Sequence, residues 1–544
     1  MQIYKHFCKE SFNPDNTLKN FELDFEDNFN FGYDVVDALA EETPDAYAVV
    51  WTNPEGEERK FTFKDISKLS NKAVNVFKKY GIKKGDRVML MLKRNYEYWY
   101  VVTALHKMGA VAIPATNMLT TEDIEYRVNA VDIKAVVCTP DDEAYNDFIT
   151  VSKKENTLET IFVPRKDAEG TVNLTDEIEK AEDTLKRIST KVEDPLLIYF
   201  TSGTTGYPKA VMHNHTYPLC HIITAKYWQN VVDGGLHLTV AETGWAKASW
   251  GKIYGQWLCG SAVMVYDFDN FSPTKLMQII EKYKVTTFCA PPTVYRYFAK
   301  KNMKKYDLSS LTHISTAGEP LNPTVSDHIY NETGLRIMEG FGQTETTLIL
   351  GTLVGTQAKP GSIGKPTPLY DVRLVDHDGN EVAQGETGEI VICPPKNRKQ
   401  YGIFNGYIGD EQMYQHAWRG GVYHTKDTAY MDEDGYFYYV GRADDLIKSR
   451  GFRVGPFEIE NIIMKHPAVL ECAVIGVPDE SRGQAIKAFI KLANGYDAEN
   501  HRLANEIKNF CNRKLASYKW IQYIEFTDEM PKTASGKIRR VELK

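Results

Sequence analysis

The sequence predicts an α/β protein with three parts: layered α/β subdomains, a small antiparallel β-barrel and a small α+β unit at the C-terminal end. Three patterns support this prediction. Short apolar runs alternate with amphipathic stretches over most of the chain, which is typical of layered sheets and helices. A succession of strands and turns begins near Asp371, and a compact pattern of helices and strands follows Gly451.

The alternation in the first part predicts strands that are largely parallel, with helices between them. The apolar runs that we expect to form strands lie at residues 87–92, 135–139, 196–200, 262–266 and 285–290. The amphipathic stretches Asp65–Tyr80 and Thr274–Tyr283 are expected to be helices. Residues 371–392 contain apolar runs separated by turn sequences, among them an Asp-Gly pair, and this pattern predicts antiparallel strands.

The C-terminal unit begins with a predicted helix. Pro456 suits the first position of a helix, and the helix is expected to end at His466, directly before Pro467. The elements expected after it are strands at 473–477 and 485–492, a helix near 503–514 and a strand near 520–526. Such a unit has a normal size for a domain.

The composition is that of an ordinary globular protein. Of the 544 residues, 42% are hydrophobic and 25% are charged. The net charge of −8 gives no general attraction to nucleic acid or to an anionic membrane. The N-terminal MQIYKHFCKE lacks the pattern of a signal peptide, and no apolar stretch approaches the about 18 residues of a membrane span. We therefore expect a cytoplasmic protein without nucleic-acid partners or integral membrane association; no feature of the sequence indicates an oligomeric state.

A loop rich in hydroxyl groups follows the predicted strand at 196–200. It reads Thr-Ser-Gly-Thr-Thr-Gly-Tyr-Pro-Lys and ends at Lys209. Its glycines allow close approach of the backbone, and its N–H groups and hydroxyls can surround phosphate oxygens. The loop is not a Walker A motif, because Pro208 precedes the lysine and Ala210 follows it. A flexible surface loop is the alternative. The residues expected to bind phosphate are Thr201, Ser202, Gly203, Thr204, Thr205, Gly206 and Lys209.

This loop closely resembles the signature loop of the adenylate-forming superfamily, which includes acyl-CoA synthetases, adenylation domains of peptide synthetases and luciferases. Further segments resemble the family's motifs in the family's order. Residues 317–320, Ala-Gly-Glu-Pro, resemble the segment that lines adenine, although a helix start is the alternative interpretation. Residues 339–346, Glu-Gly-Phe-Gly-Gln-Thr-Glu-Thr, resemble the aromatic-Gly-x-Thr-Glu motif. The resemblance implies ATP or AMP contacts from Gly318, Glu319, Pro320, Glu339, Gly340, Phe341, Gly342, Gln343 and Thr344.

The same motifs imply a magnesium site and a ribose site. Glu345 would hold Mg²⁺ together with Thr204, while Thr344 would contact the α-phosphate. Residues 423–427, Tyr-His-Thr-Lys-Asp, resemble the segment whose aspartate, here Asp427, binds the ribose hydroxyls, since a carboxylate accepts two hydrogen bonds. The family often has glycine where this chain has Lys426, so the resemblance does not predict the backbone conformation of the local turn.

The last two motifs imply a mobile C-terminal domain. Residues 441–453 resemble the interdomain hinge motif, in which Arg442 would contact ribose and Asp444 would be the hinge. Residues 531–540 resemble the C-terminal loop that carries a catalytic lysine, here Lys537. The implied division is an N-terminal adenylation domain at 1–441, with its barrel-like part from about 371, a hinge at 442–446 and a C-terminal lid at 447–544.

The resemblance covers essentially the whole chain and implies an acid–thiol ligase that uses ATP, Mg²⁺ and coenzyme A. A carboxylic acid would attack ATP to give an acyl-adenylate and pyrophosphate, and coenzyme A would then take the acyl group. Lys537, Thr344 and Glu345 would be catalytic in the first step. The second step would follow rotation of the lid; no general base for the thiol is predicted. The residues implied in contact with coenzyme A are Gly451, Phe452, Arg482 and Lys519, although ordinary surface charges are the alternative for Arg482 and Lys519. Arg453 is implied in nucleotide binding.

The acid is expected to be larger than acetate. Acetate-specific members have a tryptophan immediately before Gln-Thr-Glu, whereas this chain has Gly342. Residues 241–246 and 451–460 resemble medium-chain acyl-CoA synthetases, with Trp245 lining the acyl pocket or simply packed in the core. The sequence does not distinguish among medium-chain, branched and aryl acids as the substrate. Alternative functions are an enzyme that loads an acid onto a carrier protein, and a non-catalytic nucleotide-binding homologue.

Overall fold

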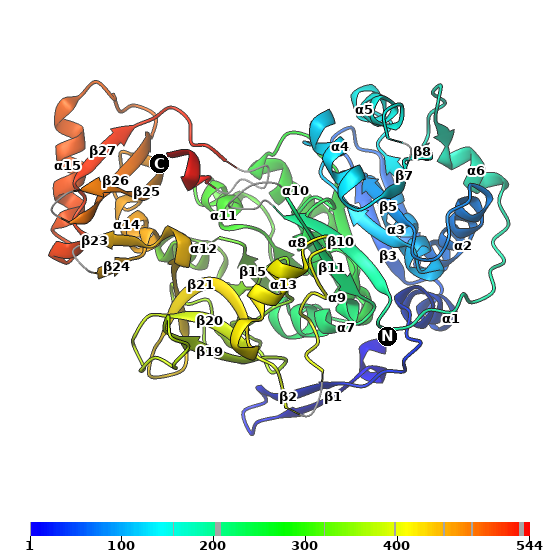
Figure 1. Ribbon diagram of the computed structural model, residues 1–544, viewed down its shortest axis with the longest axis horizontal. Coiled ribbons are helices and arrows are strands. Elements are labelled where there is room, and N and C mark those ends of the chain that lie inside the picture. The colour runs from blue at the N-terminus through cyan, green and yellow to red at the C-terminus, as the bar shows by residue number, and fades with distance from the viewer. Residues whose placement is uncertain are drawn as a thin grey trace.

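The computed structural model describes residues 2–155, 157–201, 208–319, 321–396, 399–449, 452–479, 482–532 and 538–543, and at residues 142, 452, 453 and 501 it describes the backbone alone. The chain forms two large sheets with helices, an antiparallel sheet and a smaller C-terminal unit, which lies to one side of the rest (Figure 1). This arrangement confirms the predicted α/β class.

The seven-stranded sheet has the order β11-β10-β6-β5-β7-β8-β9, and every neighbouring pair is parallel except β10 with β11. Its strands are β5 (Arg87–Met91), β6 (Val111–Pro114), β7 (Ile133–Cys138), β8 (Thr160–Val163), β9 (Val172–Asn173), β10 (Pro195–Thr201) and β11 (Lys209–Asn214). The helices of this region are α2 (Phe63–Lys79), α3 (Glu97–Met108), α4 (Thr121–Ala130), α5 (Asp142–Ser152) and α6 (Leu174–Lys180).

The nine-stranded sheet has the order β18-β17-β16-β15-β14-β12-β13-β3-β4, with parallel pairing from β16 to β3. Its strands are β3 (Tyr47–Thr52), β4 (Glu58–Thr62), β12 (Leu236–Thr239), β13 (Ala262–Tyr266), β14 (Thr287–Cys289), β15 (His313–Ala317), β16 (Ile337–Phe341), β17 (Leu350–Gly351) and β18 (Lys365–Pro366). The helices of this region are α1 (Ala38–Glu42), α7 (Tyr217–Ile222), α8 (Ala246–Gly251), α9 (Tyr254–Leu258), α10 (Pro273–Tyr283), α11 (Pro292–Phe298) and α12 (Pro323–Thr333).

Local sequence signals explain where the long helices begin. Thr62 accepts a hydrogen bond from the Asp65 backbone N–H, and the Asp65 carboxylate accepts one from the Thr62 N–H, so a capping box opens α2. Helix α10 starts with Ser272 as its N-cap and Pro273 in the first turn, and it ends at Lys284 in the left-handed region. Strand β13 is buried along its whole length, as expected for a central strand of a parallel sheet.

The chain after Asp371 forms antiparallel strands, as predicted. Strands β19 (Asp371–Val375), β20 (Gly388–Cys393), β21 (Tyr423–Met431) and β22 (Phe437–Arg442) pair in that order, and helix α13 (Glu411–Ala417) precedes β21. A separate hairpin near the N-terminus, β1 (Cys8–Phe12) with β2 (Leu18–Leu23), projects at the lower edge of Figure 1.

The C-terminal unit contains a five-stranded sheet and two helices. Its elements are β23 (Ile447–Ser449), β24 (Phe452–Val454), α14 (Pro456–Ile463), β25 (Val469–Asp479), β26 (Gly483–Leu492), α15 (His501–Asn512) and β27 (Tyr523–Phe526). Helix α14 is shorter than predicted, because after Ile463 the chain continues in turns with bonds such as His466 N–H to the Ile463 carbonyl, 3.0 Å. Strand β27 starts at Tyr523, three residues later than predicted, and a 3₁₀ turn at Ser517–Lys519 precedes it.

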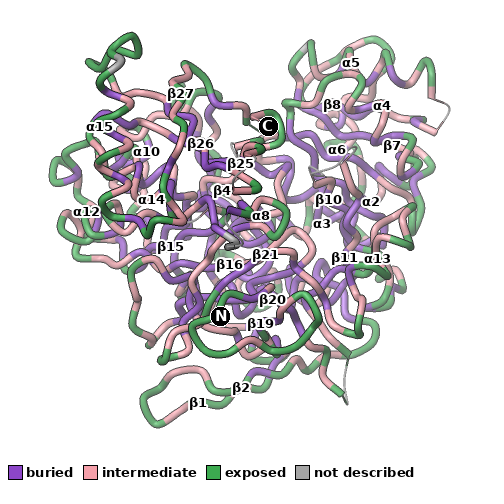
Figure 2. The backbone as a smooth tube through the Cα atoms, turned by 60° about the vertical axis from the view of Figure 1, so that its left-hand side comes forward, coloured by how far each residue is buried: buried purple, intermediate pink, exposed green. Residues whose placement is uncertain are grey.

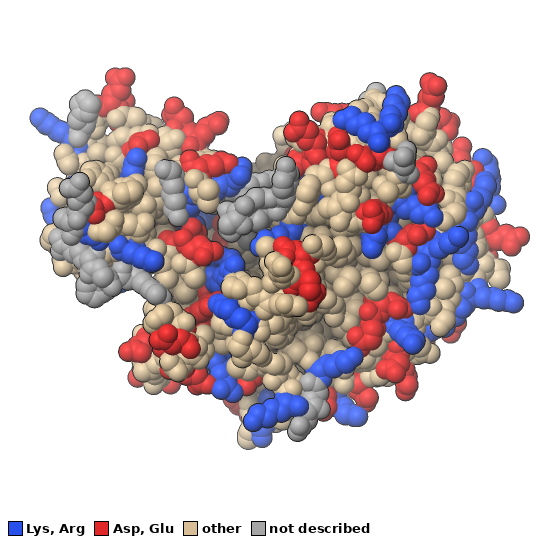
Figure 3. Space-filling view, in the orientation of Figure 1, with Lys and Arg blue, Asp and Glu red and all other residues tan. Residues whose placement is uncertain are grey.

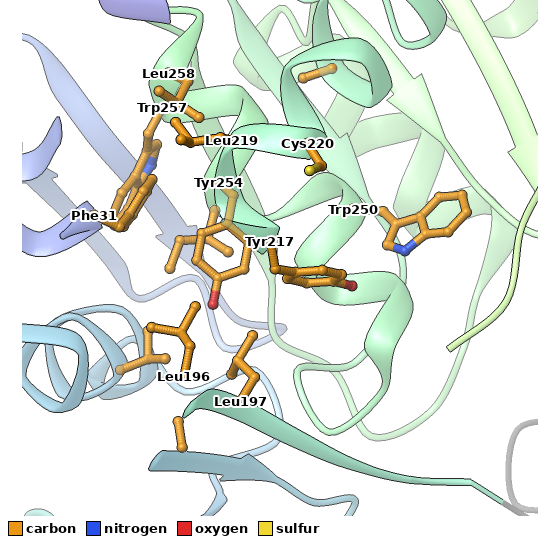
Figure 4. Packing of buried hydrophobic residues seen from close by; sticks show 14 of the residues in the cluster. Phe31, Leu196, Leu197, Tyr217, Leu219, Cys220, Trp250, Tyr254, Trp257 and Leu258 are labelled. Carbon is orange, nitrogen blue, oxygen red and sulfur yellow. The ribbon is translucent and has the colours of Figure 1, made fainter. Parts of the chain in front are cut away.

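The largest apolar cluster joins the two large sheets. Leu196 and Leu197 of β10 contribute to it, as do Tyr217 of α7 and Tyr254 of α9 (Figure 4). The buried segments run through the centre of the molecule and the exposed ones lie in its outer loops (Figure 2). Among the described residues, no helix combines the length and the apolar character needed to cross a membrane.

Candidate active site

A network around Asp427 joins the neighbouring strands β21 and β22 to Gln343, which is 84 positions away in the sequence. The buried Asp427 carboxylate accepts hydrogen bonds from Gln343 Nε2 (2.5 Å) and the Tyr439 hydroxyl (3.0 Å). Arg442 lies opposite Asp427 in the β21–β22 pairing, and its guanidinium lies 3.1 Å from the same carboxylate. The Tyr423 hydroxyl donates to Gln343 Oε1 at 2.7 Å. The network thus fixes the side chains expected to bind ribose and adenine relative to one another.

The structure gives the backbone conformation at Lys426, which the sequence did not predict. Its φ is 61°, in the left-handed region where glycine is common. This chain therefore keeps the backbone conformation that a glycine would favour, but it adds a long cationic side chain there.

Glu345 and Lys209 are brought together by a loop that follows residue 402. The Tyr407 hydroxyl donates to Glu345 Oε1 at 2.9 Å, and the Lys209 ammonium lies 5.6 Å from the centre of the Tyr407 ring. Strand β11 pairs with this loop, since Ile408 N–H bonds the Ala210 carbonyl at 3.0 Å. A carboxylate and a cation that were 136 positions apart in the sequence, at 345 and 209, therefore face one site.

His213 supports the backbone of the same segment. Its Nε2–H donates to the Thr344 carbonyl at 2.8 Å. Burial lowers the pKa of His213 to about 4, and burial lowers that of His215 to about 4 as well. Both imidazoles are neutral at physiological pH, and His213 positions Thr344.

The two expected adenine segments lie side by side. Strands β15 and β16 are parallel, with Ala317 opposite Gly340. Gly318 follows β15 with φ 101°, and the Glu319 carboxylate accepts a hydrogen bond from the Thr293 hydroxyl at 3.2 Å. Lys247 donates to the Ala317 carbonyl. A side chain at Gly340 would collide with Trp228 and Leu348, 2.7 Å away.

Glu339 of β16 is buried, and its carboxylate accepts a hydrogen bond from the Leu321 N–H at 3.3 Å. Burial raises the pKa of Glu339 from 4.5 to about 8. The side chain is therefore directed into the protein beside Leu321, whereas the sequence placed it among the nucleotide contacts.

This burial predicts a pH-dependent stability. Between pH 4.5 and about 8 the native state holds one proton more than the unfolded state, so the free energy of unfolding falls as pH rises, by at most about 1.4 kcal/mol per unit. Glu339→Gln should remove this slope. Urea unfolding of both proteins without ligand, from pH 5 to 8.5, checks this; parallel curves would contradict it.

Gly342 lies against Trp250 of α8. A Cβ at this position would come within 2.5 Å of a Trp250 ring atom and 2.5 Å of the Thr347 carbonyl. The Trp250 ring is buried and also faces Trp228 and His221, with ring centres 6.1 and 6.0 Å away. Trp245 is half-buried at the start of α8. Gly342 is therefore packed directly against a tryptophan that the sequence alone did not single out.

Arg540 ties the C-terminal tail to the hinge region. Its guanidinium donates to both oxygens of Glu460 in α14, at 2.7 and 2.9 Å, and lies 3.7 Å from Asp445. The base of the tail loop is closed by a bridge between Lys532 and Ile538. Asp444, the expected hinge, is exposed in the 3₁₀ turn Ala443–Asp445.

The residues expected to contact coenzyme A are spread over the C-terminal unit. Lys519 forms an ion pair with Glu458 of α14 at 2.6 Å. Arg482 is half-buried in the turn between β25 and β26. Phe452 and Arg453 lie in β24. A notch separates this unit from the body of the protein, and both basic and acidic side chains lie at its rim (Figure 3).

Part of the expected site lies outside the described residues, and its members are Ser202, Gly203, Thr204, Thr205, Gly206, Pro320, Gly451 and Lys537. Thr201 ends β10 and Lys209 begins β11, so the described strands flank the hydroxyl-rich loop at both ends.

Sequence reasoning missed several residues of the site. Tyr407, Tyr439 and Trp250 lie outside the motifs, and each contacts a residue of another segment, namely Glu345, Asp427 and Gly342. Tyr423 opens the Tyr-His-Thr-Lys-Asp segment, which was a usable signal.

The chain is similar to known proteins over nearly its whole length. A family model described as AMP-binding enzyme matches residues 36–408, and a model of the AMP-binding enzyme C-terminal domain matches residues 458–537. The chain is 38% identical to human mitochondrial acyl-coenzyme A synthetase ACSM3 over 540 residues, which cover 98% of this chain and 92% of that protein. It is 39% identical to 4-hydroxybutyrate–CoA ligase 1 of Metallosphaera sedula over 521 residues, 95% and 90% of the two chains.

A solved structure shares the fold. The crystal structure of the anthranilate CoA ligase AuaEII in complex with anthranoyl-AMP matches with a TM-score of 0.86 and 29% identity, and the match covers 95% of this chain and 97% of that one.

Proposed function

The chain belongs to the AMP-binding enzyme family, and we propose that it is an AMP-forming acyl-CoA synthetase. A carboxylic acid and ATP give acyl-AMP and pyrophosphate, and acyl-AMP and coenzyme A give acyl-CoA and AMP. The observation that carries the proposal is the network in which Asp427, Arg442 and Gln343 converge beside Glu345 and Lys209.

In the first half-reaction, an acid oxygen attacks the α-phosphorus of ATP and pyrophosphate leaves. The Asp427 carboxylate accepts the ribose hydroxyls, and Gln343 lies between it and the adenine segments. Lys209 and Lys537 offset the negative charge that spreads over the phosphoryl oxygens. Arg540, three positions after Lys537, is held against α14 by Glu460.

Glu345 fits a magnesium ion in its donor chemistry. It is half-buried, one carboxylate oxygen accepts from Tyr407, and no other hydrogen bond to the carboxylate comes from the described residues. A single carboxylate with phosphate oxygens and water is a common magnesium environment at nucleotide sites, and Thr204 is the proposed second protein contact. The ion would supply charge stabilisation for the phosphates.

In the second half-reaction, we propose that the C-terminal unit, residues 447–544, turns about 442–446 relative to the N-terminal domain, 1–441. The proposed contacts of coenzyme A are Gly451, Phe452, Arg482 and Lys519. Lys519 would then exchange its ion pair with Glu458 for a phosphate of coenzyme A. We propose a cytoplasmic enzyme; the human relative is named mitochondrial.

The test is a panel of carboxylic acids assayed for AMP formation with and without coenzyme A. Acid-dependent pyrophosphate release followed by acyl-CoA formation supports the proposal. Transfer to a carrier protein and not to coenzyme A would favour the loading enzyme, and absence of acid-dependent pyrophosphate release with every acid would contradict both.

We propose an acid larger than acetate, with its length limited by Trp250, since the Trp250 ring packs directly on Gly342 of the expected acyl pocket. Trp250→Leu is expected to raise kcat/KM for acids two or three carbons longer, relative to the best wild-type acid, by about tenfold. Competition between acids of different length measures this ratio.

Trp257→Leu is the matched control, because Trp257 is also a buried tryptophan of the same cluster but lies among Phe31 and Leu258, away from Trp250 (Figure 4). It should lower stability and leave the length preference unchanged. If Trp250→Leu leaves the preference for acid length unchanged, Trp250 does not limit the length of the acyl pocket.

A further inference from the structure

Two buried polar atoms without hydrogen-bond partners lie close to Trp250, the residue proposed to limit the length of the acid. They are the Tyr217 hydroxyl and His221 Nε2, both in helix α7, and neither finds a partner among the described residues. A buried polar group that makes no hydrogen bond is unfavourable and therefore rare in folded proteins. A ligand that supplies the missing hydrogen bonds would explain why both groups are present.

The two side chains lie beside each other and beside the expected acyl pocket. The Tyr217 and His221 rings are perpendicular with their centres 4.6 Å apart, and the His221 ring lies 6.0 Å from that of Trp250. The Tyr217 hydroxyl is directed toward Trp250, and the indole nitrogen of Trp250 faces it (Figure 4). The six-membered ring of the same indole packs on Gly342.

Tyr217 also adjoins the segment expected to carry the reaction. Its ring centre lies 4.0 Å from that of His213, and His213 donates to the Thr344 carbonyl. Tyr217 therefore connects the segment expected at the α-phosphate with Trp250, where the far end of the acid is proposed to lie.

The pair formed by Tyr217 and His221 is uncharged. Burial lowers the pKa of His221 well below 6.5, so the imidazole is neutral at physiological pH, and its Nδ1 lies 3.1 Å from the Thr224 hydroxyl. A second carboxylate or an ammonium group on the acid would be costly to bury against neutral partners. A hydroxyl on the acid suits the pair, because it can donate one hydrogen bond and accept another.

The polar surroundings continue at the backbone of Trp250. Gln256 donates to the Trp250 carbonyl at 3.0 Å and to Gln229 Oε1 at 2.6 Å. Gln256 Oε1 and Gln229 Nε2 have no partner in the described parts of the chain. Trp250 is thus set among polar groups, and an acid with a purely alkyl chain would leave the hydroxyl of Tyr217 and the ring nitrogen of His221 unsatisfied.

We propose that the acid carries a hydroxyl group at the end distant from its carboxylate, and that Tyr217 and His221 form hydrogen bonds with this hydroxyl. The inference rests on the proposed function and names its substrate class, the short ω-hydroxy acids. A site that hydrogen-bonds a substrate hydroxyl discriminates against the analogue that lacks it, because the buried polar groups are then left unpaired.

The test compares butanoate, pentanoate and hexanoate with their ω-hydroxy analogues in acid-dependent exchange of pyrophosphate with ATP. At the chain length that the enzyme uses best, kcat/KM for the hydroxy acid is expected to exceed that for the alkanoate by about tenfold or more. Tyr217→Phe keeps the ring on His213 and removes the hydroxyl. The preference should then fall about tenfold, while kcat/KM for the alkanoate stays within about twofold of the wild-type value.

Tyr254→Phe is the matched control. Tyr254 is a buried tyrosine of the same cluster, but its hydroxyl points away from Trp250 and lies 2.8 Å from His106 Nε2 (Figure 4). Loss of this hydrogen bond should lower the melting temperature and leave the preference for the hydroxy acid unchanged. Tyr217→Phe should instead match or exceed the wild-type melting temperature without ligand, because it loses no hydrogen bond.

If the wild-type protein uses hydroxy acids and alkanoates equally, within about twofold at every length, the inference is overturned and the proposed function stands. A Tyr217→Phe variant that retains the full preference, or that loses as much thermal stability as Tyr254→Phe, would also overturn it. Absence of exchange with every acid has a different meaning, since it contradicts the proposed function and the inference together.

Discussion

Lys537→Ala is expected to slow acid-dependent adenylation by about 10²–10³-fold or more, while transfer of a presynthesised acyl-adenylate to coenzyme A slows much less. The asymmetry follows because only the first half-reaction brings two anions together and spreads charge over phosphoryl oxygens. Acid-dependent exchange of pyrophosphate with ATP measures the first step, and acyl-CoA formation from added acyl-adenylate measures the second.

Lys532→Ala is the matched control for this variant. Lys532 lies in the same tail, and its ammonium is paired with Glu471 at 2.8 Å. Its loss should cost a little stability and leave both half-reactions near the wild-type rates. Equal damage to both half-reactions in Lys537→Ala would contradict the assigned role.

Asp427→Ala is expected to raise the KM for ATP by about 100-fold, because two hydrogen bonds between ribose and a charged group are lost. The variant also leaves Gln343, Tyr439 and Arg442 without their shared acceptor. Asp427→Asn should retain part of the affinity, since an amide oxygen still accepts. Nucleotide binding in the absence of acid measures the effect directly.

Asp434→Ala controls for the loss of a carboxylate from the same hairpin. Asp434 accepts from Lys359 at 2.5 Å in the turn between β21 and β22, away from Gln343. It should leave the KM for ATP unchanged. If Asp427→Ala binds ATP as tightly as this control, ribose lies elsewhere.

The strands were predictable because their apolar runs are continuous and bounded by polar turns. Residues 87–92 and 262–266 form β5 and β13 almost residue for residue. A strand that is buried on both faces needs apolar side chains at successive positions, and such a run is visible in the sequence. The end of α14 was less predictable. Pro467 marks where a helix must stop, but the turns after Ile463 are set by local hydrogen bonds that sequence does not reveal.

The site was predictable only where one segment carries the chemistry. Asp427 and Arg442 stand in motifs of their own, whereas their pairing needed the β21–β22 register. Tyr407 reaches Glu345 across 62 positions, and Trp250 meets Gly342 across 92. Contacts between distant segments depend on the packed structure, and the presence of a tyrosine or a tryptophan in the sequence does not indicate which residue it will contact.

The most direct test of the central claim is a crystal structure with a non-hydrolysable acyl-adenylate analogue. The account predicts ribose hydroxyls within hydrogen-bonding distance of Asp427, adenine between the segments after β15 and β16, and the acyl group directed toward Gly342 and Trp250. An analogue bound away from Asp427, or with its acyl chain directed away from Trp250, would contradict it.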